Sequence, residues 1–284
     1  MIIDSHNHPN YLNMNCDAIL DNMRMHNIDR TWLLTLETPE FEYSPGYHRM
    51  TWGNGDGPIP FDNCLACVQK HPDKFVLGYA PDPRKPHALG KLEAAIEMYG
   101  VRVYGEVMLR MMYDNPDAVA VFRYCGTRGL PVIVEVNYGH GGGGPYAAPG
   151  YWYGGGIEAF ERAIRQCPDT VFLGHGPGFW AHISGDDLYA QHSYPTGPIV
   201  PGGKVTELMR ACDNLYCDLS AGSGLNALTR DASFTKEFLL EFQDRVLYGR
   251  DIWDNKLQQF LQTLELPSDV MDKIYFRNSL ALVP

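Results

Sequence analysis

M-I-I-D-S-H-N-H at residues 1–8 is a short apolar run that ends in two histidines. Seven further short runs follow along the chain, each rich in Val, Ile, Leu or aromatic residues. Such runs are typical of parallel strands that are buried on both faces. The sequence therefore predicts eight strands, at residues 2–5, 31–36, 75–80, 101–108, 131–136, 170–174, 215–219 and 246–248.

The segments between these runs carry apolar residues on one helical face. Cys16, Ile19 and Met23, for example, lie at positions i, i+3 and i+7, which indicates an amphipathic helix. Similar patterns predict helices at residues 16–23, 89–99, 118–125, 157–167, 205–212, 232–242 and 255–264. Eight alternating strand–helix units predict an α/β protein with one (β/α)₈ TIM-barrel domain over residues 1–284. A doubly wound open sheet has the same alternation and is the alternative at this point.

The composition of the chain restricts the classes of partner that it can bind. Of 284 residues, 45% are hydrophobic and 20% are charged, and 23 Lys and Arg stand against 34 Asp and Glu, a net charge of −11. We expect no nucleic-acid partner, because phosphate binding needs basic patches. We also expect no membrane partner, because no run approaches the roughly 20 apolar residues that span a bilayer. The start lacks the basic segment of a secretory signal, and the seven cysteines are scattered and odd in number, so we expect reduced thiols and a cytoplasmic location.

Residues that can bind a metal follow several of the predicted strands. His6 and His8 are two residues apart at a strand end, so their side chains point the same way and can reach one ion. Two histidines of a surface turn would be the simpler explanation of this pair alone. The other such residues are Glu106 in the fourth run, His175 after the sixth and Asp251 after the eighth. In a barrel these positions meet at one mouth, where catalytic residues lie.

Five segments resemble one known family: I-I-D-S-H-N-H-P (2–9), H-P-D-K-F-V-L-G-Y-A (71–80), L-G-H-G (173–176), Y-G-R-D (248–251) and K-I-Y-F-R-N-S-L-A-L (273–282). The chain resembles the amidohydrolase superfamily, in its amidohydrolase-2 branch of metal-dependent hydrolases and decarboxylases. The resemblance implies a (β/α)₈ barrel with one or two divalent metals, often zinc. It assigns His6 and His8 as metal ligands, His175 as a ligand or substrate-polarising residue, and Asp251 as ligand and general base.

The fifth strand departs from the family pattern. Many relatives have a histidine there, whereas P-V-I-V-E places Glu135 at that position. Glu135 could bind a metal, act as an acid or base, or pair with a neighbouring arginine, so a second metal held in the usual way is in doubt. Glu106 could be a ligand or a bridge, as a fourth-strand glutamate is in a related deoxyribonuclease branch.

The predicted loops at the barrel mouth supply candidate substrate contacts. Arg110 could anchor a substrate carboxylate, and Asn137, His140 and Trp180 lie in loops after the fifth and sixth strands. The glycine-rich segment that begins at Gly139 suggests a lid.

These features predict a hydrolase of a small carbonyl compound, such as a lactone, amide or ester-like bond. It would use water activated by one divalent ion, with Zn²⁺ favoured and Mn²⁺ or Fe²⁺ as alternatives. One alternative function is a metal-dependent, non-oxidative decarboxylase of a small unsaturated or cyclic acid, and another is an inactive barrel that binds a ligand. A small molecule is the expected partner, and a homodimer is compatible with the apolar mouth loops.

Overall fold

The computed structural model describes residues 1–39, 42, 58–139 and 152–284. Within these residues, eight parallel strands lie side by side in chain order. Each strand overlaps one of the predicted runs, so the prediction of eight strands is confirmed. The strands are β1 (Ile3–Asn7), β2 (Arg30–Leu33), β3 (Phe75–Leu77), β4 (Tyr104–Val107), β5 (Val132–Glu135), β6 (Phe172–His175), β7 (Leu215–Asp218) and β8 (Val246–Leu247).

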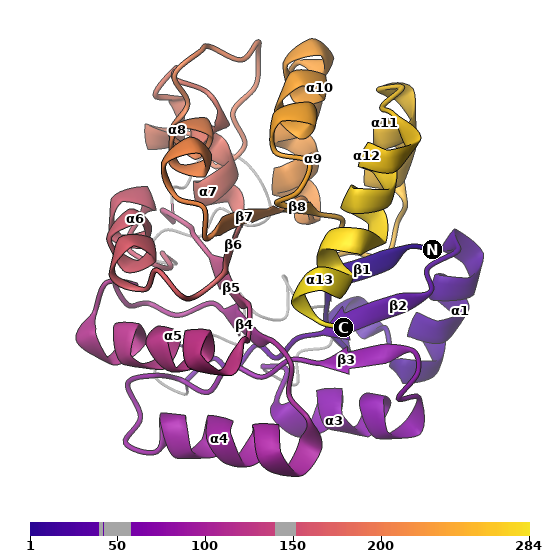
Figure 1. Ribbon diagram of the computed structural model, residues 1–284, viewed down its shortest axis with the longest axis vertical. Coiled ribbons are helices and arrows are strands. Elements are labelled where there is room, and N and C mark those ends of the chain that lie inside the picture. Colours follow the sequence, from indigo (N-terminus) through magenta and orange to yellow (C-terminus); the bar gives the residue numbers. More distant parts are fainter. Residues whose placement is uncertain (40–41, 43–57, 140–151) are drawn as a thin grey trace.

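Backbone hydrogen bonds close the strands into a ring. Between β3 and β4, Gly78 pairs with Val103 in parallel register, and Arg102 N donates to Leu77 O at 2.9 Å. Between β8 and β1, Ser5 N donates to the carbonyl of Tyr248 at 3.0 Å. An open sheet would leave two free edges, so this closure excludes the doubly wound alternative and confirms the (β/α)₈ barrel (Figure 1).

Helices surround the strands on the outside of the ring (Figure 1). All seven predicted helices are present, and the described residues form five further α-helices, most of them short. The helices are α1 (Cys16–His26), α3 (Phe61–Lys70), α4 (Ala88–Tyr99), α5 (Pro116–Arg128), α6 (Ile157–Gln166), α7 (Pro177–Trp180), α8 (Lys204–Ala211), α9 (Ala221–Thr229), α10 (Ala232–Glu241), α11 (Lys256–Thr263), α12 (Ser268–Asp272) and α13 (Asn278–Leu282), with a π-helical turn at Lys273–Arg277 between the last two. All seven cysteines are free thiols, as predicted.

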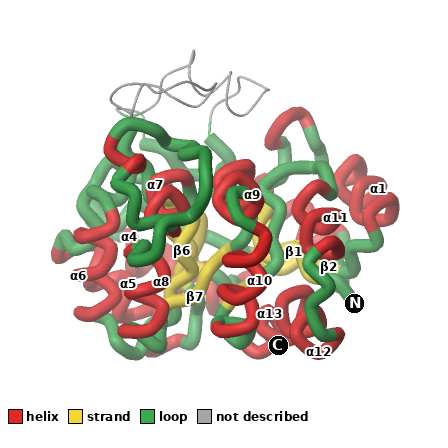
Figure 2. The backbone as a smooth tube through the Cα atoms, turned by 90° about the horizontal axis from the view of Figure 1, so that it is seen from above, coloured by secondary structure: helices red, strands yellow, loops and turns green. Residues whose placement is uncertain are grey.

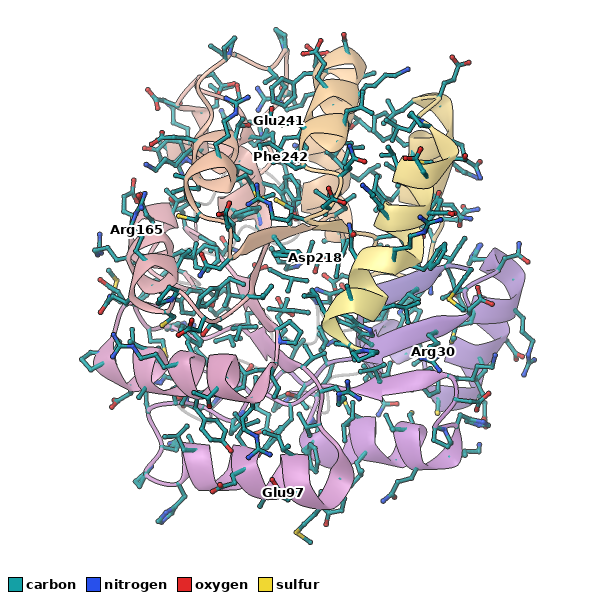
Figure 3. The ribbon with its side chains drawn as sticks, in the orientation of Figure 1. Arg30, Glu97, Arg165, Asp218, Glu241 and Phe242 are labelled. Atoms are coloured by element: carbon teal, nitrogen blue, oxygen red, sulfur yellow. The ribbon has the colours of Figure 1, made fainter. Side chains whose placement is uncertain are left out.

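The side chains of the outer helices, of the layer between helices and strands, and of the interior of the strand ring differ in character. Charged residues such as Glu97, Arg165 and Glu241 lie on the outer helices, whereas Asp218 lies inside the ring (Figure 3). The largest apolar layer fills the space between strands and helices. A second, smaller apolar cluster draws its members from the strands and their extensions and from the C-terminus: Ile3, Trp32, Leu34, Val103, Ile133, Leu173, Leu247 and Val283.

The second apolar cluster closes one end of the barrel. Val283 follows α13, and Figure 2 shows both chain termini at the end where α12 and α13 lie. The carboxyl ends of the strands form the opposite end, which is where a barrel places its chemistry. Among the described residues, no helix has the length and apolar character needed to cross a membrane.

Candidate metal centre

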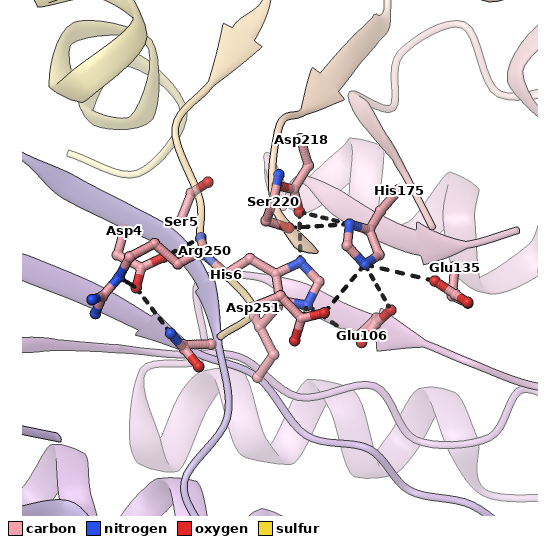
Figure 4. Close-up of polar contacts among 12 residues, drawn as sticks. Asp4, Ser5, His6, Glu106, Glu135, His175, Asp218, Ser220, Arg250 and Asp251 are labelled. Atoms are coloured by element: carbon pink, nitrogen blue, oxygen red, sulfur yellow. Dashed lines mark hydrogen bonds and ion pairs between the residues drawn. The ribbon is translucent and has the colours of Figure 1, made fainter. Parts of the chain in front are cut away.

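The predicted ligands converge at the carboxyl ends of the strands (Figure 4). His6 lies on β1 with His8 directly after it, Glu106 lies on β4, His175 ends β6, and Asp251 follows β8. The three imidazoles are buried, with at most 2% of each residue exposed. Four segments that are distant in sequence thus place side chains in one enclosed space, because parallel strands all end at the same mouth.

The two β1 histidines form one half of the cluster. Their Nε2 atoms lie 3.1 Å apart. Glu106 Oε2 is 3.3 Å from both Nε2 atoms. Asp251 Oδ1 is 3.3 Å from His8 Nε2 and 3.9 Å from His6 Nε2. Two nitrogen and two oxygen atoms therefore surround one point.

His175 forms the other half. Its Nε2 atom lies 3.8 Å from Glu106 Oε1, 3.6 Å from Asp251 Oδ2 and 3.6 Å from Glu135 Oε2. Glu106 and Asp251 each turn one oxygen toward the β1 histidines and the other toward His175. Both carboxylates therefore connect the two halves.

Hydrogen bonds on the far side of the rings define the histidine tautomers. His8 Nδ1 lies 2.9 Å from the carbonyl oxygen of Leu34, which can only accept. His6 Nδ1 lies 2.5 Å from Asp218 Oδ2. Burial alone would raise the pKa of Asp218, but its contacts with His6 hold that pKa below the usual value, so the carboxylate is ionised and accepts. In both residues Nδ1 donates, and in the neutral ring Nε2 then carries the lone pair.

This arrangement needs a positive charge between the rings. Two Nε2 lone pairs that face each other at 3.1 Å cannot form a hydrogen bond with one another. Two ligand atoms about 2.1 Å from a zinc ion at the tetrahedral angle lie about 3.4 Å apart, close to the spacings here. Neutral imidazole and carboxylate are the ligands that Zn²⁺, Mn²⁺ and Fe²⁺ accept. The residues therefore fit a divalent cation.

Electrostatics point to the same conclusion. Burial by itself lowers the pKa of His6, but Asp218, Asp251 and Glu106 outweigh it and hold this pKa well above the usual value. For Glu106 the direction is reversed. Burial by itself raises the pKa of this carboxyl group, but the neighbouring imidazoles outweigh burial and lower it to about 2. The carboxylates thus stay ionised and draw positive charge into the cluster, which protons supply when no metal is bound.

Glu135 differs from the other carboxylates. Burial, together with the charges of Glu106 and Asp251, raises its pKa to about 8 although His175 acts in the opposite direction. Its other contact is with Asn137, whose Nδ2 lies 3.4 Å from Oε1. A β-carbon at position 176 would lie 2.1 Å from Glu135 Oε2, so the glycine there makes room for this side chain. Burial and the two neighbouring carboxylates therefore favour the protonated form of Glu135.

The remaining predicted residues lie in different places. Asn137 is buried beside Glu135, with Oδ1 accepting from Gly139 N at 3.0 Å. Arg110 N donates to Glu42 Oε2 at 3.0 Å, on the rim beyond β4. Trp180 is 1% exposed and packs in the core, where Nε1 donates to the carbonyl oxygen of Asp218 at 3.1 Å.

The predicted lid and the predicted arginine partner of Glu135 remain to be placed. His140 and residues 141–151 of the glycine-rich segment lie outside the described residues. Arg250 binds Asp4 at 2.8 Å and Asn22 at 2.8 Å and so points toward the helix layer. Among the described residues, the ion-pair and hydrogen-bond partners of the Glu135 side chain are His175 and Asn137, and no arginine is among them.

Two residues of the centre were absent from the sequence prediction. Asp218 ends β7 and binds His6, and Ser220 Oγ lies 3.1 Å from His175 Nδ1. The signal for Asp218 was present in L-Y-C-D-L-S (215–220), an acidic residue at the end of a buried strand. The same signal identified Asp251 after β8.

Comparison with known proteins found similar folds among solved structures. No protein-family model and no curated protein sequence matches the chain. An uncharacterized TIM-barrel protein from Bordetella bronchiseptica is 18% identical, with a TM-score of 0.67 over 99% of this chain and 98% of that one. An amidohydrolase from Burkholderia multivorans with bound HEPES is 11% identical, with a TM-score of 0.62 over 99% and 98%.

A dihydroxybenzoic acid decarboxylase from Polaromonas is 14% identical, with a TM-score of 0.60 over 99% of this chain and 96% of that one. Its structure contains manganese and the inhibitor 2-nitroresorcinol. Over its full length, the chain therefore has the TIM-barrel fold that an amidohydrolase and a metal-containing decarboxylase share.

Proposed function

We propose that the chain is a metal-dependent enzyme of the amidohydrolase superfamily, in its amidohydrolase-2 branch, that hydrolyses a small carbonyl compound such as a lactone, amide or ester. The observation that carries this proposal is the 3.1 Å approach of His6 Nε2 and His8 Nε2, with both Nδ1 atoms bonded to acceptors. The shared fold and the sequence resemblance support it.

In this proposal His6, His8 and Asp251 hold the ion, and Glu106 extends the ligand set toward His175. A bound divalent ion would act as a Lewis acid toward the substrate carbonyl and would lower the pKa of water. Zn²⁺ is the proposed ion, and Mn²⁺ is the alternative because the Polaromonas decarboxylase contains it. A second ion would require Glu135 as a ligand, because Glu106, Glu135 and His175 form a second group of ligand atoms.

The chain's own residues then move the proton. His6 and His8 hold the pKa of Asp251 below its usual value although burial opposes this, so its carboxylate is ionised and can accept a proton from the attacking water. Asp251 would pass that proton to the leaving group. His175 Nε2, 3.6 Å from Asp251 Oδ2, would contact the substrate carbonyl. Glu135, which holds a proton near neutral pH, would act as a second acid. Asn137 and Arg110 are the proposed substrate contacts on the rim.

Decarboxylation is the second candidate, and Glu135 favours it. A protonated carboxyl group beside the ligands can deliver a proton to carbon after carbon dioxide leaves. The structural likeness to a dihydroxybenzoic acid decarboxylase is the other support. In that reaction Asp251 would keep its place in the centre, but no water oxygen would enter the product.

Product analysis in ¹⁸O-labelled water separates these functions. Zinc- or manganese-loaded protein is incubated with a panel of small lactones, amides and unsaturated carboxylic acids. Hydrolysis predicts heavy oxygen in the product carboxyl group. Released carbon dioxide, with solvent deuterium on carbon in a parallel D₂O reaction, would instead establish the decarboxylase. Tight metal and ligand binding without turnover of any compound would favour the inactive binding protein.

A further inference from the structure

Asp218 is fully buried beneath the metal centre and contacts two of its imidazoles. Its Oδ2 atom lies 2.5 Å from His6 Nδ1 and 3.5 Å from His175 Nδ1. These histidines come from β1 and β6, on either side of the cluster (Figure 4). One carboxylate oxygen therefore faces the outer nitrogen of one ring in each half.

The surroundings hold this carboxylate in place. Ser220 N donates to Asp218 Oδ1 at 2.9 Å, and Ser220 Oγ lies 3.1 Å from His175 Nδ1. On the other side, a β-carbon at position 249 would lie 2.8 Å from Asp218 Oδ1 and 3.2 Å from His6 Cβ. The glycine of Y-G-R-D thus lets β8 approach the carboxylate closely, and Asp218 has little freedom to turn away.

We infer that Asp218 is the positioning residue of the centre: its Oδ2 accepts the proton of His6 Nδ1 and, beside Ser220 Oγ, faces His175 Nδ1, so that the Nε2 atoms of both rings are directed at the metal. This inference rests on the proposed metal-dependent function and adds to it a residue that touches neither metal nor substrate. A carboxylate behind an imidazole fixes the ring orientation and strengthens Nε2 as a donor. Because the same oxygen binds His6 and lies 3.5 Å from His175 Nδ1, loss of Asp218 affects both halves, and His6 most directly.

The test compares Asp218→Asn with Asp82→Asn. Asp82 is also a buried aspartate, and it pairs with Arg84 through bonds of 2.8 Å and 3.0 Å, away from the cluster. Zinc affinity is measured by competition with a chromophoric chelator. We expect Asp218→Asn to weaken zinc binding about 10- to 100-fold, and Asp82→Asn to leave it within about twofold. A lower melting temperature with unchanged zinc affinity in Asp218→Asn would overturn the inference, because it would show a merely structural role.

Proton–nitrogen NMR of ¹⁵N-histidine-labelled protein gives an independent readout. His6 Nδ1 carries a proton whether or not Nε2 does, so a far-downfield Nδ1–H resonance is expected in wild-type protein with and without zinc. It should disappear in Asp218→Asn and persist in Asp82→Asn. Zinc coordination through His6 Nδ1, or a His6 ring protonated only at Nε2, would overturn the inference even if Asp218→Asn does not fold.

These readouts also separate the inference from the proposed function. If wild-type protein binds neither zinc nor manganese, the metal-dependent function fails. The Nδ1–H resonance of metal-free protein then still decides whether Asp218 orients His6.

Discussion

The two ends of the barrel interior are built from the same strand faces but have opposite chemistry. Leu173 and His175 are two residues apart on β6, so their side chains point the same way. Leu173 belongs to the apolar cluster at the closed end, whereas His175 belongs to the metal centre. Ile133 and Glu135 repeat this relation on β5.

Burial is nearly complete at both ends, yet it acts on stability in opposite directions. At the closed end it removes apolar surface from water and stabilises the fold. At the centre it removes charged groups from water, which costs free energy unless an opposite charge or a metal compensates. The position of a residue along a strand thus separates residues that stabilise the barrel from residues that we propose to take part in catalysis. Substitutions at the two ends test whether these roles are separate.

The largest effect is expected at His6. His6→Ala removes a ligand from the centre and should abolish tightly held metal, whereas wild-type protein should hold about one ion per chain. Elemental analysis after zinc loading and gel filtration measures this. His26→Ala, on α1 and outside the cluster, is the control and should retain the metal. Equal metal content in His6→Ala and wild type would show that the cluster is not the metal site.

The next effect concerns Asp251. Asp251→Asn keeps the size of the side chain but removes the proton acceptor, so turnover of any substrate found should fall by about 10²-fold or more. Rates are measured at saturating metal, so that lost occupancy does not imitate lost chemistry. Asp254→Asn, three residues further along, is the matched control. A rate within about threefold of wild type would remove Asp251 from the proposed proton transfer.

A smaller effect is expected from His182, a buried histidine outside the metal centre. Its Nε2 lies 2.7 Å from the Tyr138 hydroxyl oxygen, and its ring lies tilted against that of Tyr189, with 3.9 Å between the centroids. Burial lowers the pKa of His182 to about 4, with Asp187 raising it and Lys204 lowering it further. The neutral ring is therefore favoured in the folded chain, in contrast to His6, whose pKa is raised.

The pH dependence follows from this direction. In the unfolded chain a histidine titrates near 6.5, so the contribution of neutral His182 is full above about pH 6.5 and is lost as the pH falls toward 4. The loss should be about 2 kcal/mol after allowance for the solvated part of the ring. Urea unfolding between pH 4 and 7 measures it, with His182→Gln as the comparison. Parallel pH profiles for the two proteins would contradict this assignment.

The smallest effect tests the closed end. Ile133→Val removes one buried methylene two residues before Glu135 and should cost about 1 kcal/mol of unfolding free energy. Metal content and turnover should not change, because the residue lies in the apolar cluster. Denaturant unfolding and metal analysis on the same sample decide this. A change in zinc affinity would show that the two ends are not separable.

Most of the fold could be predicted because its signals are local. Each strand is a short apolar run, and seven helices show regular apolar spacing. The helices that were missed lack that signal: α7 is the four-residue segment P-G-F-W, and α9 contains two glycines within nine residues. α3 is different, since its buried Cys64 and Cys67 do lie at helical spacing.

The residues that end the strands can be identified from the order of residues along the chain, and with them the candidate ligands His6, His8, Glu106, His175 and Asp251. How these groups face one another depends on the tertiary structure. Asp218 is 212 residues from His6, and no local pattern pairs them, because closure of the barrel brings the ends of β7 and β1 close together on either side of β8. The pKa of Glu135 is likewise set by burial and by charges from β4 and the loop after β8. Such properties depend on distances through space, which the order of residues along the chain does not specify.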